Sequence, residues 1–179
     1  MQKPLTDPVD VGLLSASRTS FRRTYALAVF ERLRDGLAKD EGSAEVEFRF
    51  HEANEFPALE GEVRARPWLV CQRCLNPYPQ AVESPFRVAF ASSEDAAAQV
   101  PEEYEGVVAP HGRAKLAELV EDELLLALPL VPMHASPEEC EAAGAEAPAA
   151  LAADADDDPA SEKTESQRPF ASLRELLDR

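Results

Sequence analysis

The hydrophobic and polar positions of this chain alternate most clearly in the stretch AEVEFRF. Val46, Phe48 and Phe50 fall on one side of an extended chain and charged residues fall on the other, which predicts a half-buried β-strand. Similar patterns recur further along the chain, so that four strands are expected, near Thr19, Val46, Val63 and Val82. We expect them to form an antiparallel sheet or a partial barrel.

Helical spacing replaces this alternation in residues 114–126, where leucine and valine recur every three or four positions. This pattern predicts one long helix packed on the sheet, stopped by Pro129 and Pro132, and hence an α+β fold. A shorter helical pattern follows the first strand, with Val29, Phe30, Leu33 and Leu37 on one face. The acids of the long helix allow two interpretations: Glu118, Glu121 and Asp122 as a solvated face, or Glu121, Asp122 and Glu123 as a partner-binding surface.

Composition divides the chain into three parts. Residues 1–139 carry the periodic segments and form the expected core domain. Residues 140–167 consist mainly of alanine, aspartate, glutamate and proline, which cannot bury enough apolar surface to offset the entropy of ordering, so an acidic disordered linker is expected. Residues 168–179 regain an amphipathic pattern that predicts a short C-terminal helix, docked on the core or on a partner.

The charge of the chain is strongly acidic but uneven. The net charge is −16, from 34 acidic and 18 basic residues, and residues 121–165 alone hold 13 acids against one lysine. Acidity of this kind disfavours contact with nucleic acid and favours a basic protein partner. Residues 1–40, in contrast, carry 7 basic and 5 acidic residues and are mildly basic.

The cysteines provide the main candidate chemistry. Three cysteines without a secretion signal argue for reduced thiols in a cytoplasmic protein, and no segment is long enough to span a membrane. Cys71 and Cys74 have the spacing of a zinc clip, and His134 and Cys140 supply the only available second pair. Thiols that simply pack in the core are the alternative. A redox dithiol is disfavoured, because a turn and a strand follow the pair where such a site needs a helix.

A second candidate surface surrounds the cysteine pair. Arginine and aromatic side chains occur together there and suit phosphate contact and stacking on unpaired RNA bases; the candidate residues are Arg64, Arg66, Trp68, Arg73 and Tyr78. The alternative is that Trp68 fills core space and the arginines pair with the abundant acids. Phosphate-binding loops and nucleophile motifs are missing from the sequence, so the residues favour a binding protein over an enzyme.

Three segments resemble the YceD family of large ribosomal RNA subunit accumulation proteins: LVCQRCLNPY, LVEDELLLALPLVPMH with a cysteine soon after, and RPFASLRELL. The resemblance implies a non-enzymatic factor in the synthesis, processing or stability of 23S ribosomal RNA. Such a factor would act by binding this RNA or a large-subunit precursor, with no membrane or small-molecule partner. The alternative function is an acidic adaptor for a basic ribosomal or RNA-processing protein.

Overall fold

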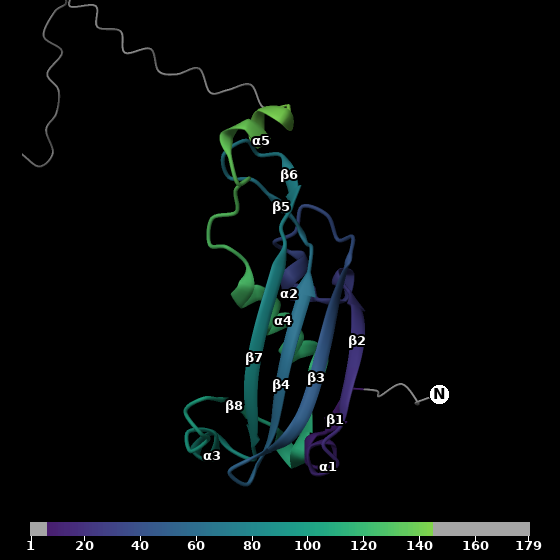
Figure 1. Cartoon of the computed structure of the whole chain (residues 1–179), viewed down its shortest axis with the longest axis vertical. Helices are drawn as coiled ribbons and strands as arrows, with labels where there is room; N and C mark the ends of the chain where they lie inside the picture. The colour runs from purple at the N-terminus through teal and green to yellow at the C-terminus, as the bar shows by residue number, and fades with distance from the viewer. Residues whose placement is uncertain (1–6, 145–179) are drawn as a thin grey trace, which may run out of the picture. The chain divides into compact units, whose positions relative to one another are not determined.

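The computed structural model of the protein describes residues 7–144, and its centre is a five-stranded sheet in the order β2-β3-β4-β7-β8 (Figure 1). The strands are β2 (Ser20–Ala26), β3 (Ser43–Ala53), β4 (Phe56–Ala65), β7 (Val82–Ala91) and β8 (Glu105–Val108). The first four are the strands expected from the sequence, and they pair antiparallel. The predicted α+β class is confirmed, in the form of an open sheet and not a barrel within residues 7–144.

The last strand departs from the expected arrangement. β8 pairs with β7 in parallel, with Val88 opposite Glu105 and Ala91 opposite Val108. β8 is not among the four strands expected from the sequence. The connection from β7 to β8 includes the short helix α3 (Glu94–Ala97). A long crossover of this kind brings the chain back alongside β7, so that β8 can run parallel to it. The four predicted strands thus form the antiparallel part of the sheet, and β8 adds a parallel strand at this edge.

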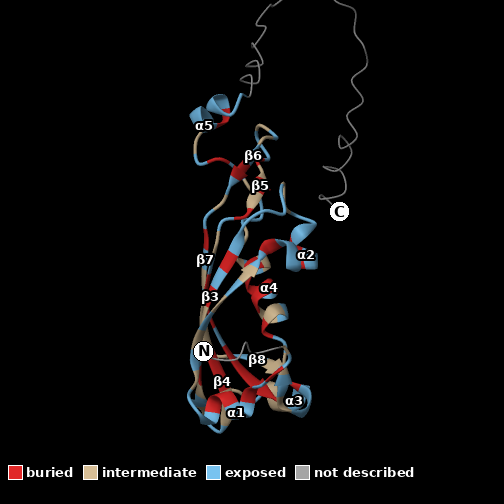
Figure 2. Cartoon of the chain, turned by 90° about the vertical axis from the view of Figure 1, so that its right-hand side faces the viewer, coloured by how far each residue is buried: buried red, intermediate tan, exposed pale blue. Residues whose placement is uncertain are grey.

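Helices cover one face of the sheet (Figure 2). α4 (Leu116–Ala127) lies against β7 and β4, and it is the helix predicted over 114–126. α1 (Val11–Ala16) lies against β3 and β4, while α2 (Glu31–Arg34) contacts α4. The pattern over residues 29–37 therefore forms only one helical turn, after the 3-10 turn Leu27–Val29. No helix within residues 7–144 is long and apolar enough to cross a membrane.

Smaller elements complete the described chain. They are β1 (Val9–Asp10) paired with β9 (Arg113–Ala114), β5 (Trp68–Val70) paired with β6 (Pro77–Pro79), the 3-10 turn Pro110–Gly112, and α5 (Pro137–Ala142). α5 belongs to the same compact unit as the sheet. The predicted domain boundary after residue 139 stays a prediction. The predicted linker beyond residue 144 and the helix at 168–179 lie outside the described residues.

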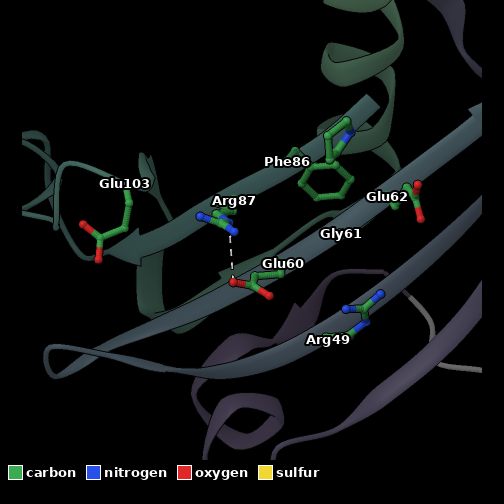
Figure 3. Close-up of a pocket in the computed structure, with 8 residues that line it drawn as sticks. Arg49, Glu60, Gly61, Glu62, Phe86, Arg87 and Glu103 are labelled. Atoms are coloured by element: carbon green, nitrogen blue, oxygen red, sulfur yellow. Dashed lines mark ion pairs between the residues drawn. The ribbon is translucent and has the colours of Figure 1, made fainter. Parts of the chain in front are cut away.

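The opposite face of the sheet carries alternating charges. Within β4, Arg64 pairs with Glu62 (2.7 Å), and ion pairs between strands join Arg64 to Glu83 (3.1 Å), Arg22 to Glu47 (3.6 Å) and Arg87 to Glu60 (3.5 Å). Figure 3 shows the last pair beside a shallow pocket on β4 and β7. Antiparallel sheets commonly keep one face solvated in this way. Exposed pairs of this kind contribute little to stability, because solvent screens the charges.

Gly61 has a packing role in the centre of β4. Its backbone lies beneath the buried ring of Phe86 on β7, and a β-carbon built at Gly61 would stand 2.1 Å from Phe86 Cζ (Figure 3). Phe86 also meets the ring of Phe48 edge-on at 6.5 Å, so it cannot move without disturbing the core. A glycine here lets the aromatic ring cover the strand.

We expect Gly61→Ala to lower the free energy of unfolding by about 1.5 kcal/mol, the usual cost of overpacking a core. Urea unfolding followed by circular dichroism measures this quantity. Gly12→Ala in α1 is the matched control, because a β-carbon there meets only Asp10 Oδ1 at 3.6 Å. That control should be neutral or stabilising by up to about 1 kcal/mol. Equal effects of the two substitutions would contradict the packing role.

Candidate metal centre

Three separate segments bring the cysteines and His134 together. The elements next to them, β5, β6 and α5, lie at one end of the sheet (Figure 1). β5 ends at Val70, and the turn that follows carries Cys71 and Cys74 before β6 begins. The backbone N–H of Leu75 donates to the carbonyl of Cys71 at 2.8 Å and closes this turn. The cysteine pair therefore lies in a turn between two strands, with no helix directly after it.

The second pair arrives from the chain beyond α4. The N–H of Gln72 donates to the carbonyl of Pro132 at 2.8 Å, which fastens the segment after α4 to the cysteine turn. His134 follows directly, and α5 then places Cys140 over the same turn. The five residues between His134 and Cys140 fold back through the start of α5, where Ser136 caps the helix by accepting from the N–H of Glu139. The two predicted pairs thus meet in space.

The four donor atoms form a compact cluster. Cys71 Sγ lies 3.9 Å from Cys140 Sγ, and His134 Nδ1 lies 3.4 Å from Cys74 Sγ and 3.5 Å from Cys140 Sγ. All four atoms lie within 4.8 Å of one another. Three thiols and one imidazole arranged so closely form a Cys3His set that could hold a metal ion, as the sequence predicted.

The surroundings of the thiols favour ionisation of Cys71 and oppose ionisation of Cys140. Burial acts to raise the pKa of the Cys71 thiol, but hydrogen bonds, led by the backbone N–H of His134 and joined by that of Arg73, lower it overall. Burial and the neighbouring thiols raise the pKa of Cys140. A second thiolate in this cluster therefore needs a cation beside it, and a bound metal ion supplies one.

A small apolar cluster surrounds the candidate centre and is distinct from the main core. It consists of Leu69, Cys71, Tyr78 and Cys140, with Leu37, Cys74 and Leu128 partly buried around it. The ring of Tyr78 lies 4.8 Å from that of His134, and Arg73 Nη1 lies 3.8 Å from Cys140 Sγ. So few buried side chains give this end of the molecule little packing of its own.

The predicted RNA-contacting residues lie around the same turn but differ in accessibility. Arg66 and Arg73 are exposed. Arg64 is exposed as well, but it is held by Glu62 and Glu83. Trp68 is half-buried with Lys39 Nζ 4.1 Å from the centre of its ring, and Tyr78 is buried. RNA contact by these residues stays a prediction, and the arginines are the members in the best position to make it.

The three adjacent acids of α4 that the sequence analysis named as a possible partner-binding surface occupy different environments. Asp122 is exposed and pairs with Arg32 at 2.6 Å. Glu121 is buried, although the sequence suggested a solvated face, and its carboxylate accepts from the backbone N–H groups of Arg32 (2.7 Å) and Leu33 (3.2 Å). Glu123 is also buried, with Ser84 Oγ at 3.5 Å. Partner binding by these acids stays a prediction.

Two basic residues make contacts that were not expected from the sequence. Arg32 donates to Glu121 through Nε (3.1 Å) and Nη2 (2.9 Å), and Lys39 covers the ring of Trp68. Both contacts join residues distant in the sequence, so no local pattern could have indicated them. The apolar pair Val107 and Val108 was the local signal for β8 that could have been used.

The fold and the clustered thiols together define a class of protein: a small α+β domain with a candidate metal centre at one end of an open sheet. The family model described as Large ribosomal RNA subunit accumulation protein YceD matches residues 59–177. The chain therefore belongs to the YceD family, which confirms the resemblance noted in the sequence. The family name connects it with accumulation of the large ribosomal RNA subunit.

A curated relative supports the same assignment. The chain is 37% identical over 152 residues to the Large ribosomal RNA subunit accumulation protein YceD of Haemophilus influenzae. The aligned region covers 82% of this chain and 85% of that protein, so the similarity extends over nearly the whole length of both. No solved structure matches the chain significantly.

Proposed function

We propose that the chain is a non-enzymatic factor for accumulation of 23S ribosomal RNA, acting in the cytoplasm in its synthesis, processing or stability. It acts by binding the RNA or a large-subunit precursor through the end of the sheet that carries the Cys3His cluster. Family membership supports the biological role. The observation that carries the mode of action is the exposure of Arg66 and Arg73 beside a turn that a metal ion would hold rigid.

The ion that suits the cluster is zinc. Soft thiolate ligands with one imidazole select zinc over magnesium or calcium, which take oxygen ligands. Typical zinc bond lengths in a regular tetrahedron place two sulfur atoms about 3.8 Å apart and a sulfur and a nitrogen about 3.6 Å apart. The corresponding distances here are 3.9 Å between Cys71 and Cys140 Sγ, and 3.4 Å and 3.5 Å from His134 Nδ1 to Cys74 and Cys140 Sγ.

Zinc would act as a structural element in this function. It would fasten the cysteine turn to the segment after α4 and to α5, where the local apolar cluster is small. A structural zinc site closes all four positions with protein ligands and leaves none for substrate. This arrangement agrees with a binding role and involves no catalytic step.

Binding of purified full-length protein to a large-subunit ribosomal RNA fragment, measured over a salt titration, tests the RNA contact. Each RNA phosphate that the protein neutralises makes the plot of log binding constant against log salt concentration steeper by about 0.9. We expect Arg66→Ala and Arg73→Ala each to weaken binding and to reduce this slope by about 1. Arg64→Ala should lower the RNA affinity less, because the Arg64 guanidinium is already paired with Glu62 and Glu83.

Arg22→Ala is the matched control for these substitutions. Arg22 is an exposed arginine of β2 outside the candidate surface, and its side chain is 82% accessible. The control should leave the RNA affinity unchanged if contact is confined to the end with the cysteine turn. Equal losses for Arg22, Arg66 and Arg73 would mean diffuse attraction, and an absence of binding at low salt would exclude direct contact.

A further inference from the structure

A groove lies between α4 and the edge strand β8. Its volume is about 670 Å³. The apolar part of its lining includes Phe90, Val107, Val108, Leu119, Leu125 and Leu126. Leu126 is 75% exposed and Val108 is 39% exposed, so large apolar side chains face solvent at its rim. Exposed apolar surface of this kind marks interaction sites.

Acidic side chains line the same groove. Glu105, Glu118, Asp122 and Glu123 contribute carboxylates, against Arg113 and Lys115 as cations. Lys115 is paired with Glu118, and Asp122 is paired with Arg32. Within residues 7–144, neither Glu105 nor Glu123 has an ion-pair partner. Among the acids of the groove, Glu105 on β8 and Glu123 on α4 are therefore the two without a compensating cation in the described part of the chain.

Glu123 is the more unusual of these two acids. It is only 7% exposed, and Ser84 Oγ at 3.5 Å is a distant hydrogen-bond donor. Burial, reinforced by the nearby Glu105 carboxylate, raises the pKa of Glu123. A cation brought into the groove would relieve this cost, because an opposite charge close by stabilises the ionised carboxylate.

The position of β8 suggests the form of the ligand. β8 is the last strand of the sheet and pairs only with β7 among the described strands. Extended peptides bind other proteins by adding a strand to such an edge, while their side chains enter neighbouring pockets. A groove between an edge strand and a helix offers both kinds of contact to one segment.

We propose that the groove between β8 and α4 binds an extended segment of a basic partner protein, in which apolar residues alternate with lysine or arginine. The apolar side chains contact Val108 and Leu126, and the cationic ones pair with Glu105 and Glu123. Complementary charge steers such a segment to the groove and fixes its register. This inference goes beyond the proposed RNA contact, concerns a different surface, and stands or falls independently of it.

The test uses full-length protein and a short fluorescein-labelled peptide in which lysine and valine alternate, followed by fluorescence anisotropy. We expect Glu105→Lys and Leu126→Arg each to weaken binding at least tenfold, since each removes one attractive contact and adds a repulsive one. Glu102→Lys and Leu130→Arg are the matched controls. They make the same changes at exposed positions outside the groove and should leave the affinity unchanged.

A peptide of alternating lysine and serine should bind at least tenfold more weakly than the lysine and valine peptide, because it cannot use the apolar lining. Equal losses in the groove variants and in their controls would mean long-range attraction to an acidic protein, and would overturn the proposal. An absence of binding at low salt would overturn it as well. Crosslinks from ribosomal RNA to Val108 or Leu126 would assign the groove to RNA instead.

Discussion

Purified protein is expected to carry one zinc ion per chain, and Cys71→Ser should remove it. A structural zinc ion is worth about 10 to 16 kcal/mol of apparent binding free energy in small domains, and this energy depends on all four ligands. Replacement even of groups that only support a ligand costs about 10-fold to 100-fold in affinity, so loss of the Cys71 thiolate should cost more. Native mass spectrometry and the zinc-to-protein ratio measure the outcome.

Two histidines provide a matched comparison for the metal. His134→Asn removes the only nitrogen ligand of the cluster and should lower zinc affinity, while His111→Asn changes an exposed histidine elsewhere and should not. Hydrogen exchange should rise in residues 71–76 and 137–142 when zinc is chelated, because the metal holds these segments together. Full zinc retention by Cys71→Ser, or freshly purified protein without metal, would return the cysteines to a packing role.

Glu121→Gln is expected to lower the free energy of unfolding by about 3 kcal/mol. The carboxylate of Glu121 caps α2 from a distant helix, because Phe30 at the N-cap position offers no side-chain hydrogen bond. It also pairs with Arg32 at 2.9 Å. A buried hydrogen bond to a charged group contributes about 1.5 to 3 kcal/mol, and a glutamine oxygen replaces only part of these bonds. Urea unfolding at neutral pH measures the loss.

Glu123→Gln is the control on the same helix and should be neutral or stabilising, because nothing comparable holds the Glu123 carboxylate. The pH dependence separates the two acids further. Burial acts to raise the pKa of Glu121, but hydrogen bonds from Leu33 and Arg32 lower it overall. Its stabilisation is therefore complete above the unfolded pKa of about 4.3 and is lost as the pH falls through the folded value.

The difference in unfolding free energy between the wild type and Glu121→Gln should accordingly be largest at neutral pH and shrink below about pH 4. The raised pKa of Glu123, due first to burial, has the opposite sign: it costs stability once the pH exceeds the unfolded value. Any benefit of Glu123→Gln should therefore appear at neutral pH and vanish in acid. A difference for Glu121→Gln that does not change with pH would contradict a role for its ionised form.

The antiparallel strands and the long helix could be predicted because their signals are local. Val46, Phe48 and Phe50 alternate with charged residues in sequence and lie on the buried face of β3 in the structure. The stripe along α4 likewise follows from spacing alone. β8 was missed because it has only four residues, and because its pairing with β7 depends on the crossover and not on any pattern within the strand.

The residues of the candidate metal centre could be predicted from the sequence, but their arrangement in space could not. The pairing of Cys71 and Cys74 with His134 and Cys140 follows from the limited supply of ligands in the sequence. His134 and Cys140 reach the cysteine turn because of the hydrogen bond from Gln72 to Pro132 and because of the turn of α5. Both are tertiary features. The burial of Glu121 and Glu123 was hidden for the same reason, since both lie among acids that look solvated.

The end of the molecule that carries the Cys3His cluster is expected to support accumulation of 23S ribosomal RNA. The most direct measurement is the ratio of large to small ribosomal RNA in the native host after deletion of the gene and complementation with variants. We predict that deletion lowers this ratio, that wild type and His111→Asn restore it, and that Cys71→Ser and His134→Asn do not. An unchanged ratio on deletion, or full restoration by a Cys71→Ser protein that contains no zinc, would contradict the account.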